Sequence, residues 1–274
     1  MRADLVPDGL WERVAPLLPP VAERRHRYPG RLRVPDRAAL AGVMYVLRTG
    51  VAWRDVPAET VGCSGVTAWR RLRDWTEAGV WPRLHAALLA ELRQADLLDL
   101  DDCAIDGSHV RALKGGDHVG PSPVDRARPG SKHHVIVDRH GTPLAVTLTG
   151  GNRHDVTQLL PLLDAVPPIR GLRGRPRRKP QRLYADRGYD YDKYRRRLWK
   201  RGIKPMIAQR GVAHGSGLGK VRWVVERAFA WLHQFKRLRI RYERRADLHQ
   251  GFLELACSVI CLRRLQQSRR SPGQ

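Results

Sequence analysis

Apolar residues recur at helical spacing through the first third of the chain, with glycines and prolines between the runs. A repeat of three to four residues predicts amphipathic helices. One helix should begin near Asp36, expected as its N-cap, and end at Gly50. Ser64 is expected to cap another helix over 66–78. Residues 1–95 are therefore predicted to form an all-helical domain.

After about residue 100 the pattern changes to short apolar runs that are typical of strands. The expected strands lie at 103–106, 134–137, 144–148, 182–185 and 203–208. The strands over 134–137 and 144–148 are expected to form a hairpin. One helix is expected to begin at Asp155, taken as its cap. Three further helices are expected over 191–201, 221–235 and 248–265. Two polar stretches, 111–131 and 167–181, are expected to be loops. An antiparallel trio followed by parallel strands and crossover helices predicts a mixed α/β sheet flanked by helices.

The domain organisation follows from these two patterns. Residues 100–266 are expected to form the second domain, and 267–274 a basic tail. The helix over 66–78 follows a short turn and carries Arg70 and Arg71, as the second helix of a helix-turn-helix would. An ordinary three-helix unit with a solvated arginine face fits the same residues, and the sequence leaves both interpretations open.

The charge of the chain is strongly unbalanced. Lys and Arg number 51 against 27 Asp and Glu, for a formal net charge of +24. Such an excess repels itself unless a polyanion neutralises it, and duplex DNA carries about one negative charge per ~1.7 Å of axis. Charge therefore favours a nucleic-acid partner, although a protein that only packs DNA or RNA would be equally basic.

The sequence shows no pattern of a secreted or membrane protein. The four cysteines form no Cys-x-x-Cys pair, so no zinc ribbon is expected, and Cys257 and Cys261 are expected to be buried reduced thiols. No signal peptide and no membrane-spanning run is visible. We expect a cytoplasmic protein, associated with the nucleoid, that has no membrane partner.

Three acidic residues occupy the local settings that a metal site would use. Asp106 and Asp186 each end a short apolar run, and Glu226 lies on the predicted helix 221–235. If the two strands are neighbours, these carboxylates can converge. Carboxylates are the ligands that Mg²⁺ prefers, and two such ions can act on a phosphodiester. Taken singly, an Asp at a strand end is more often a turn residue or a cap.

The sequences around these acids resemble the catalytic blocks of the IS5-type insertion-sequence transposases. The three strings are Ile105-Asp106-Gly107-Ser108-His109, Tyr184-Ala185-Asp186-Arg187-Gly188-Tyr189 and Val225-Glu226-Arg227-Ala228-Phe229. Tyr45-Val46-Leu47-Arg48-Thr49-Gly50 and Trp53-Arg54-Asp55-Val56-Pro57 extend the resemblance to the N-terminal third, so that it spans essentially the whole chain.

The resemblance implies an RNase H-like catalytic domain of the DDE class behind a helical DNA-binding domain. Asp106, Asp186 and Glu226 would hold two Mg²⁺ ions, for which Mn²⁺ could substitute. The protein would bind the terminal inverted repeats of its element, cut at the ends and join the 3′-OH ends to target DNA. Because two ends are processed together, a homodimer is expected on double-stranded DNA.

A set of basic residues is expected to contact DNA phosphates. Its members are Arg70, Arg71, Lys132, Arg187, Arg222, His233, Lys236 and Arg237. Related elements often carry Lys or Arg seven residues after the Glu, where this chain has His233, so Lys236 or Arg237 could take that role instead. The alternative function is a silent or domesticated DNA-binding regulator derived from such an element.

Overall fold

The computed structural model describes residues 5–21, 27, 32–211 and 219–270, without the side chains of 219–222, 269 and 270. The N-terminal part is helical, as predicted. Its elements are α1 (Asp8–Val14), η1 (Ala15–Leu17), α2 (Asp36–Thr49), η2 (Trp53–Asp55), α3 (Ala58–Val61), α4 (Gly65–Glu77) and α5 (Val80–Gln94).

Two of the three predicted helix boundaries in this part are confirmed. The Ser64 side chain accepts a hydrogen bond from the Thr67 amide and caps α4. Gly50 ends α2 at φ 74°, a left-handed conformation that glycine adopts without strain. The Asp36 cap is wrong, because α2 begins one residue earlier than the prediction requires and Pro35 is its N-cap.

The second part is built on a mixed sheet of seven strands among the described residues. They are β1 (Asp102–Ala112), β2 (Gly120–Pro121), β3 (Pro129–Val137), β4 (Pro143–Gly150), β5 (Arg182–Ala185), β6 (Lys204–Ile207) and β7 (Ile240–Arg241). β3 pairs antiparallel with β1, β2 and β4, whereas β5 and β7 run parallel to β1, and β6 runs parallel to β5. The predicted mixed α/β sheet flanked by helices is confirmed.

β1 is much longer than the predicted strand over 103–106. It pairs with β3 from Ala104, opposite Val137, to Arg111, opposite Gly130. Its second half is polar and only partly buried, so it carries no apolar run that would reveal a strand. The expected loop over 111–131 is correspondingly shorter and contains β2.

Helical segments connect and cover the strands. They are η3 (Asp155–Gln158), α6 (Leu159–Asp164), η4 (Arg187–Tyr189), α7 (Asp192–Lys200), α8 (Gly219–Leu232), η5 (Lys236–Leu238) and α9 (Ala246–Arg270). The predicted cap at Asp155 is wrong, because His154 is the N-cap of η3, and the His154 side chain makes no capping hydrogen bond. α9 extends beyond the predicted helix and includes residues 267–270 of the expected tail, whereas 271–274 lie outside the described residues.

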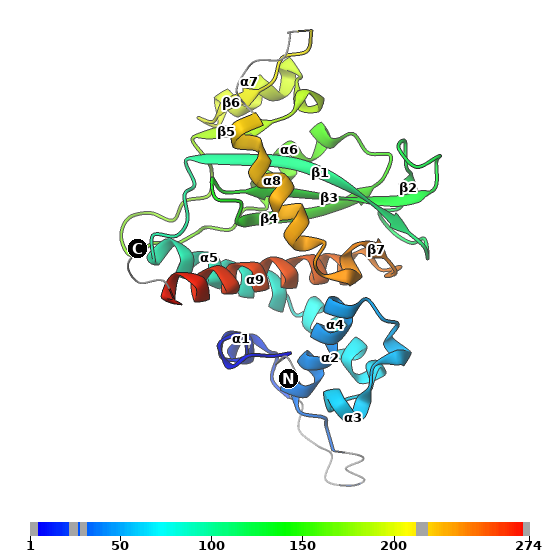
Figure 1. Ribbon diagram of the computed structural model, residues 1–274. Helices are drawn as coiled ribbons and strands as arrows, with labels where there is room; N and C mark the ends of the chain where they lie inside the picture. The colour runs from blue at the N-terminus through cyan, green and yellow to red at the C-terminus, as the bar shows by residue number, and fades with distance from the viewer. Residues whose placement is uncertain (1–4, 22–26, 28–31, 212–218, 271–274) are drawn as a thin grey trace.

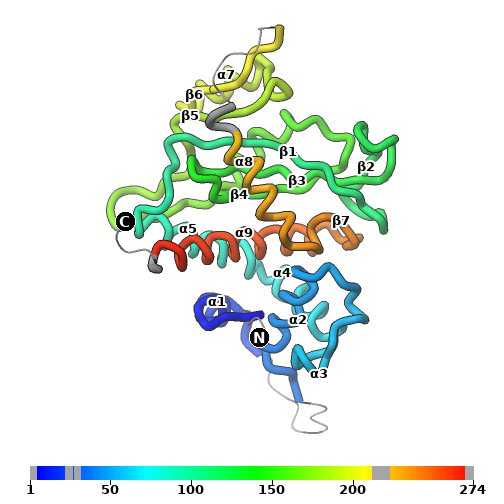
Figure 2. Tube along the Cα trace, viewed as in Figure 1, coloured from blue at the N-terminus to red at the C-terminus, as the bar shows by residue number. Residues whose placement is uncertain are grey.

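The two parts of the chain share one hydrophobic core. α5 and α9 pack on each other and lie between the sheet and helices α1–α4, as Figure 1 shows. The tube in Figure 2 follows the chain from the blue N-terminal helices through α5 into the green strands. α8 crosses the sheet over β1 and β3. Within the described ranges, no helix is both long enough and apolar enough to cross a membrane.

Candidate active site and nucleic-acid surface

The parallel pairing of β1 with β5 aligns two of the three predicted acids. Asp102, Cys103 and Ala104 lie opposite Arg182, Leu183 and Tyr184. The same register, continued one step past the end of β5, places Asp106 of β1 level with Asp186. Asp106 does not end a strand, as the sequence suggested, but lies in the middle of β1.

Local hydrogen bonds orient both aspartates. The Gly107 amide donates to Oδ1 of Asp106 at 2.8 Å. Asp186 is the N-cap of η4, and its Oδ1 accepts from the Gly188 amide at 2.8 Å. The turn into η4 takes the chain out of the sheet directly after β5, so Asp186 sits at the point where the strand ends.

Glu226 lies on α8, the helix that packs on β1, β3 and β5. Val225, Ala228 and Leu232 of this helix are buried, whereas Glu226 is exposed. Within the described part of the chain, no three His, Cys, Asp or Glu side chains are grouped closely enough to hold a metal ion. The two aspartates are therefore aligned by the sheet, while the convergence of Glu226 with them stays a prediction.

The chemistry of the three side chains nevertheless fits a hard divalent cation. All three are carboxylates, and oxygen donors of this type bind Mg²⁺ and Mn²⁺. Asp106 lies in β1, Asp186 directly follows the neighbouring strand β5, and Glu226 lies on α8, which packs on both strands. The donor set is thus suitable, and it is drawn from elements that are already in contact.

Two of the predicted DNA contacts lie on α4. Arg70 is exposed, next to a groove of about 540 Å³ that Ser64 and Thr67 also line. Arg71 is mostly buried, and its Nε donates to Asp36 at 3.1 Å. Arg70 is therefore available to a phosphate, whereas the Arg71 charge is engaged by the first residue of α2.

The structure places Lys132 in the interior rather than on a DNA-binding surface. Its side chain is 6% exposed, its Nζ lies 3.0 Å from Oδ1 of Asp155, and it donates to the Arg153 carbonyl. This ion pair explains why Asp155 does not act as a helix cap. A phosphate could reach the ammonium only by displacing Asp155.

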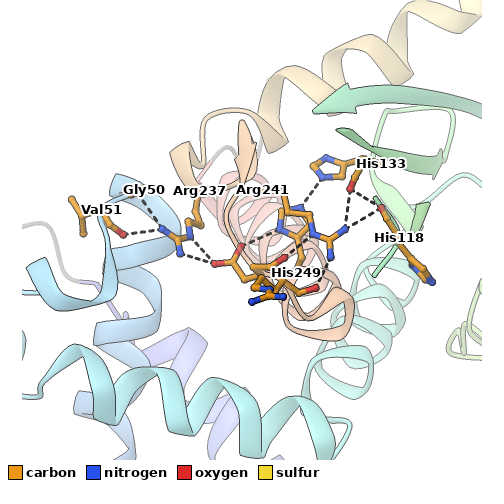
Figure 3. Close-up of polar contacts among 10 residues, drawn as sticks. Gly50, Val51, His118, His133, Arg237, Arg241 and His249 are labelled. Atoms are coloured by element: carbon orange, nitrogen blue, oxygen red, sulfur yellow. Dashed lines mark hydrogen bonds and ion pairs between the residues drawn. The ribbon is translucent and has the colours of Figure 1, made fainter. Parts of the chain in front are cut away.

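Arg237 is also an internal group, although it was expected to contact DNA. Its Nη2 and Nε donate to Oε1 of Glu243 at 2.6 and 2.8 Å, with both side chains buried. Its Nη1 donates to the Val51 carbonyl at 3.0 Å, just beyond the end of α2. Arg237 thus joins the N-terminal helices to the segment between α8 and α9, as Figure 3 shows.

The remaining basic residues differ in how accessible they are. Lys236 is exposed and Arg187 is half-buried. Burial and the neighbouring charge of Arg239 lower the pKa of His233, so this side chain is neutral near pH 7. Lys236 is consequently better placed than His233 for the basic role after Glu226. The side chain of Arg222 lies outside the described residues.

Sequence reasoning missed a buried polar network that continues from Arg237. His249 on α9 contacts Oε2 of Glu243 at 3.3 Å, and its other ring nitrogen lies 2.8 Å from Nε2 of His133 on β3 (Figure 3). Burial alone would raise the pKa of Glu243, but the His249 hydrogen bond and the Arg237 charge outweigh burial and lower it. No local motif announces these contacts, because His133 and His249 are distant in the sequence.

The four cysteines are free and buried, which confirms the prediction for Cys257 and Cys261. Burial raises the pKa of the thiols of Cys103 and Cys257. Buried, protonated thiols are inert towards metals and oxidants. The cysteines therefore belong to the hydrophobic core and not to the site.

Comparison with known families assigns the chain to the DDE transposases. The chain belongs to the family described as "Transposase DDE domain", whose model matches residues 98–261, more than half of the chain. A second model, described as "Putative transposase of IS4/5 family", matches residues 6–85. The resemblance inferred from the catalytic blocks is confirmed.

Two proteins from Burkholderia cepacia are similar to this chain. One is the "Putative transposase for insertion sequence element IS402", 64% identical over 157 residues, which are 56% of this chain and 74% of that protein. The other is the "Insertion element IS402 uncharacterized 16.2 kDa protein", 54% identical over 124 residues, which are 45% of this chain and 84% of that protein.

Solved structures resemble this chain only distantly. "Crystal structure of a pre-cleavage Mos1 transpososome" is 14% identical, with 89% of this chain and 82% of that chain covered, at a TM-score of 0.27. "Crystal structure of the Mos1 mariner paired end complex with Mn" is 10% identical, with 90% and 82% covered, at a TM-score of 0.24. Similarity at this level supports no functional conclusion.

Proposed function

We propose that this chain is the transposase of an insertion element and binds the terminal inverted repeats of that element. It cleaves DNA at the element's ends and joins the 3′-OH ends to target DNA. The alignment of Asp106 and Asp186 by the β1–β5 register, in a chain of the DDE family, is the observation that carries this proposal.

Asp106, Asp186 and Glu226 would hold two Mg²⁺ ions, with Mn²⁺ as a substitute. When bound, such a pair activates the attacking hydroxyl or water and stabilises the leaving oxygen of a phosphodiester. The amides of Gly107 and Gly188 fix the orientation of the two aspartates before any ligand arrives. This preorganisation spares the site the cost of ordering these side chains during the reaction.

The exposed basic residues would hold the DNA. Arg70 on α4 and Lys236 after α8 are accessible, and contacts of this kind position a duplex without reading its sequence. Processing of two element ends together favours a homodimer on the DNA. The division into a DNA-binding domain over 1–95 and a catalytic domain over 100–266 belongs to the same proposal.

A cleavage and joining assay tests the proposed function. DNA that carries the element's ends is incubated with the protein and Mg²⁺, and Asp106→Asn is expected to reduce nicking and joining by at least ~10³-fold. Binding of the same DNA in EDTA should change little, because the substitution removes a proposed metal ligand and no DNA contact. Asp96→Asn, at an exposed position with φ 56° that Asn tolerates, is the matched control.

The same assay separates the alternative function. If wild-type protein binds the ends in EDTA but neither nicks nor joins them with Mg²⁺ or Mn²⁺, the chain is a DNA-binding regulator. Equal activity of wild type and Asp106→Asn would remove Asp106 from the reaction.

A further inference from the structure

We propose that a groove between α8 and α9, which none of the three acids lines, binds the phosphodiester backbone of DNA. The groove has a volume of about 490 Å³. Its principal lining residues are His140, Arg227, Trp231, Arg263, Arg264 and Gln267, and it is called the α8–α9 groove below. This inference rests on the proposed function, since it extends the path of the DNA beyond the catalytic acids.

The α8–α9 groove concentrates positive charge that the protein neutralises only in part, through the buried carboxylate of Asp138, whose charge acts on Arg227 and Arg264. Among the described residues, Arg227, Arg263 and Arg264 form no ion pair with a carboxylate. Arg264 donates to the hydroxyl of Thr142 at 2.5 Å, and Arg227 donates to the carbonyl of His140. Three guanidinium groups share one groove, and Arg227 and Arg264 donate there to neutral oxygens, so the groove provides a site for an anion.

Arg227 carries the clearest sign of a missing partner. Its Nε atom is buried and has no hydrogen-bond acceptor. The guanidinium lies over the rings of Trp223 and Trp231, at 4.3 and 5.0 Å from the ring centroids, which fixes its plane. Burial and the nearby charge of Arg264 lower the pKa of Arg227 by more than the charge of Asp138 raises it, so a further negative charge would stabilise its ionised form.

The chemistry of the α8–α9 groove favours a phosphodiester. A planar guanidinium donates two parallel hydrogen bonds to phosphate oxygens, and arginine is well suited to this recognition. Trp231 and the exposed Trp223 add flat apolar surfaces of the kind on which bases and sugars pack. Arginine and tryptophan together are typical of a surface that follows a nucleic-acid strand.

The position of the α8–α9 groove on α8 connects it with the proposed site. Arg227 follows Glu226 directly in the helix, so the two side chains project in directions about 100° apart. One edge of α8 therefore carries the proposed metal ligand, and the next edge borders the groove. DNA that crosses α8 at Glu226 would reach the groove arginines along its own backbone.

DNA binding in EDTA tests this inference without using the reaction. The binding of a fluorescent random-sequence duplex is measured by anisotropy over a range of salt concentrations. Each lost phosphate contact lowers the slope of log K against log salt by about 0.9. We expect Arg227→Gln/Arg263→Gln to raise Kd about tenfold and to reduce the slope by about two relative to wild type. The control Arg196→Gln removes one exposed charge from α7.

A second measurement on wild-type protein avoids any dependence on the folding of the variants. Phenylglyoxal modifies accessible arginines, and Arg263 is exposed. We expect bound duplex DNA to protect Arg263 from modification, as read by peptide mass spectrometry.

The results separate this inference from the proposed function. If the double variant matches Arg196→Gln in Kd and slope, or if DNA leaves Arg263 as reactive as before, the groove assignment is overturned while transposase activity on element ends stands. Failure of the wild-type protein to bind any duplex would overturn both.

Discussion

Gly107 is the residue whose surroundings tie the fold of β1 most directly to Asp106. A Cβ atom at this position would lie 2.8 Å from Oδ1 of Asp155 and 3.2 Å from Nδ1 of His134. The Asp155 carboxylate cannot easily retreat, because Lys132 holds it from β3. The Gly107 amide also orients Asp106. Any shift of β1 to relieve the contact therefore moves a proposed metal ligand.

We expect Gly107→Ala to destabilise the protein by about 1–3 kcal/mol, the usual cost of overpacking. It should also reduce cleavage more than DNA binding, since it displaces Asp106 and no phosphate contact. Urea unfolding and the cleavage assay measure the two effects. Gly9→Ala is the control, because a Cβ there meets its neighbours at 3.6 Å or more. Full activity and stability of Gly107→Ala would show that Asp155 moves freely.

His85 gives a prediction about pH. Burial lowers its pKa to about 4, against the raising effect of a hydrogen bond to the Pro143 carbonyl. His85 binds a proton near pH 6.5 in the unfolded chain but only near pH 4 in the folded chain. The folded state therefore loses stability relative to the unfolded state as pH falls from 6.5 towards 4. At ~1.4 kcal/mol per unit, this one residue should cost about 2 kcal/mol by pH 5.

The measurement is the free energy of unfolding in urea at pH 7 and pH 5. His85→Gln keeps a donor for Pro143 and has no proton to gain, so its loss between the two pH values should be smaller by about 2 kcal/mol. The exposed His154→Gln should behave as wild type. An equal pH dependence in His85→Gln and wild type would mean that His85 titrates normally.

Single residues also show what the sequence could and could not reveal. Asp186 was recognisable because its setting is local: a short apolar strand ends and a turn begins. Lys132 and Arg237 were assigned to DNA because their partners, Asp155 and Glu243, are defined only by tertiary packing. The net charge predicts a polyanionic partner for the whole chain, but it does not show which Lys and Arg side chains form ion pairs inside the protein.

At the scale of elements, the Arg237 network joins α2, η5 and α9. Arg237 donates to the Val51 carbonyl after α2 and to Glu243 before α9, and both charges are buried. Removal of one partner from a buried pair leaves the other charge without compensation, which typically costs about 3–5 kcal/mol. We expect Arg237→Ala to be destabilising on this scale.

The double variant Arg237→Ala/Glu243→Gln distinguishes this role from a contact with DNA. Because it also removes the uncompensated charge, it should recover part of the lost stability in urea unfolding. Its affinity for DNA in EDTA should equal that of wild type. A variant of normal stability but weakened DNA binding would restore Arg237 to the DNA-contacting set.

The extent of β1 shows why elements are harder to predict than motifs. Its first half is apolar and was recognised, whereas its second half is polar, so that 107–110 were assigned to no element and 111–112 to the expected loop. That half is a strand because β3 pairs with it as far as Arg111 and because β7 adds to its other edge. Neither β3 nor β7 is adjacent to this half of β1 in the sequence. Its strand conformation therefore depends on pairing in the sheet and cannot be recognised from its own residues.

At the scale of the whole molecule, α9 decides how the parts of the chain depend on each other. Phe252, Leu255 and Val259 follow helical spacing, lie on one face of α9 and are buried. Residues outside that face, Leu253 and Cys257, are buried as well. Between residues 251 and 262 α9 is buried on nearly all sides and needs partners on each of them. It finds them in the N-terminal helices, the sheet and α8.

This arrangement predicts that residues 1–95 do not fold without α9. Leu84, Leu88 and Leu92 of α5 are fully buried, on the helix that packs on α9. Exposing each of them would cost about 1.5–3 kcal/mol, which together is comparable to the whole stability of a small domain. A fragment of residues 1–95 should therefore lack a cooperative transition.

In the full chain, tryptophan fluorescence and far-UV circular dichroism should report one coincident urea transition. Five of the eight tryptophans precede residue 96, so fluorescence follows mainly the N-terminal helices, whereas circular dichroism follows all elements. Two separated transitions, or a fragment 1–95 that melts like the full chain, would show that the helical part is an independent domain. Coincidence would mean that DNA held by the N-terminal helices and acids held by the sheet are positioned by one continuous core.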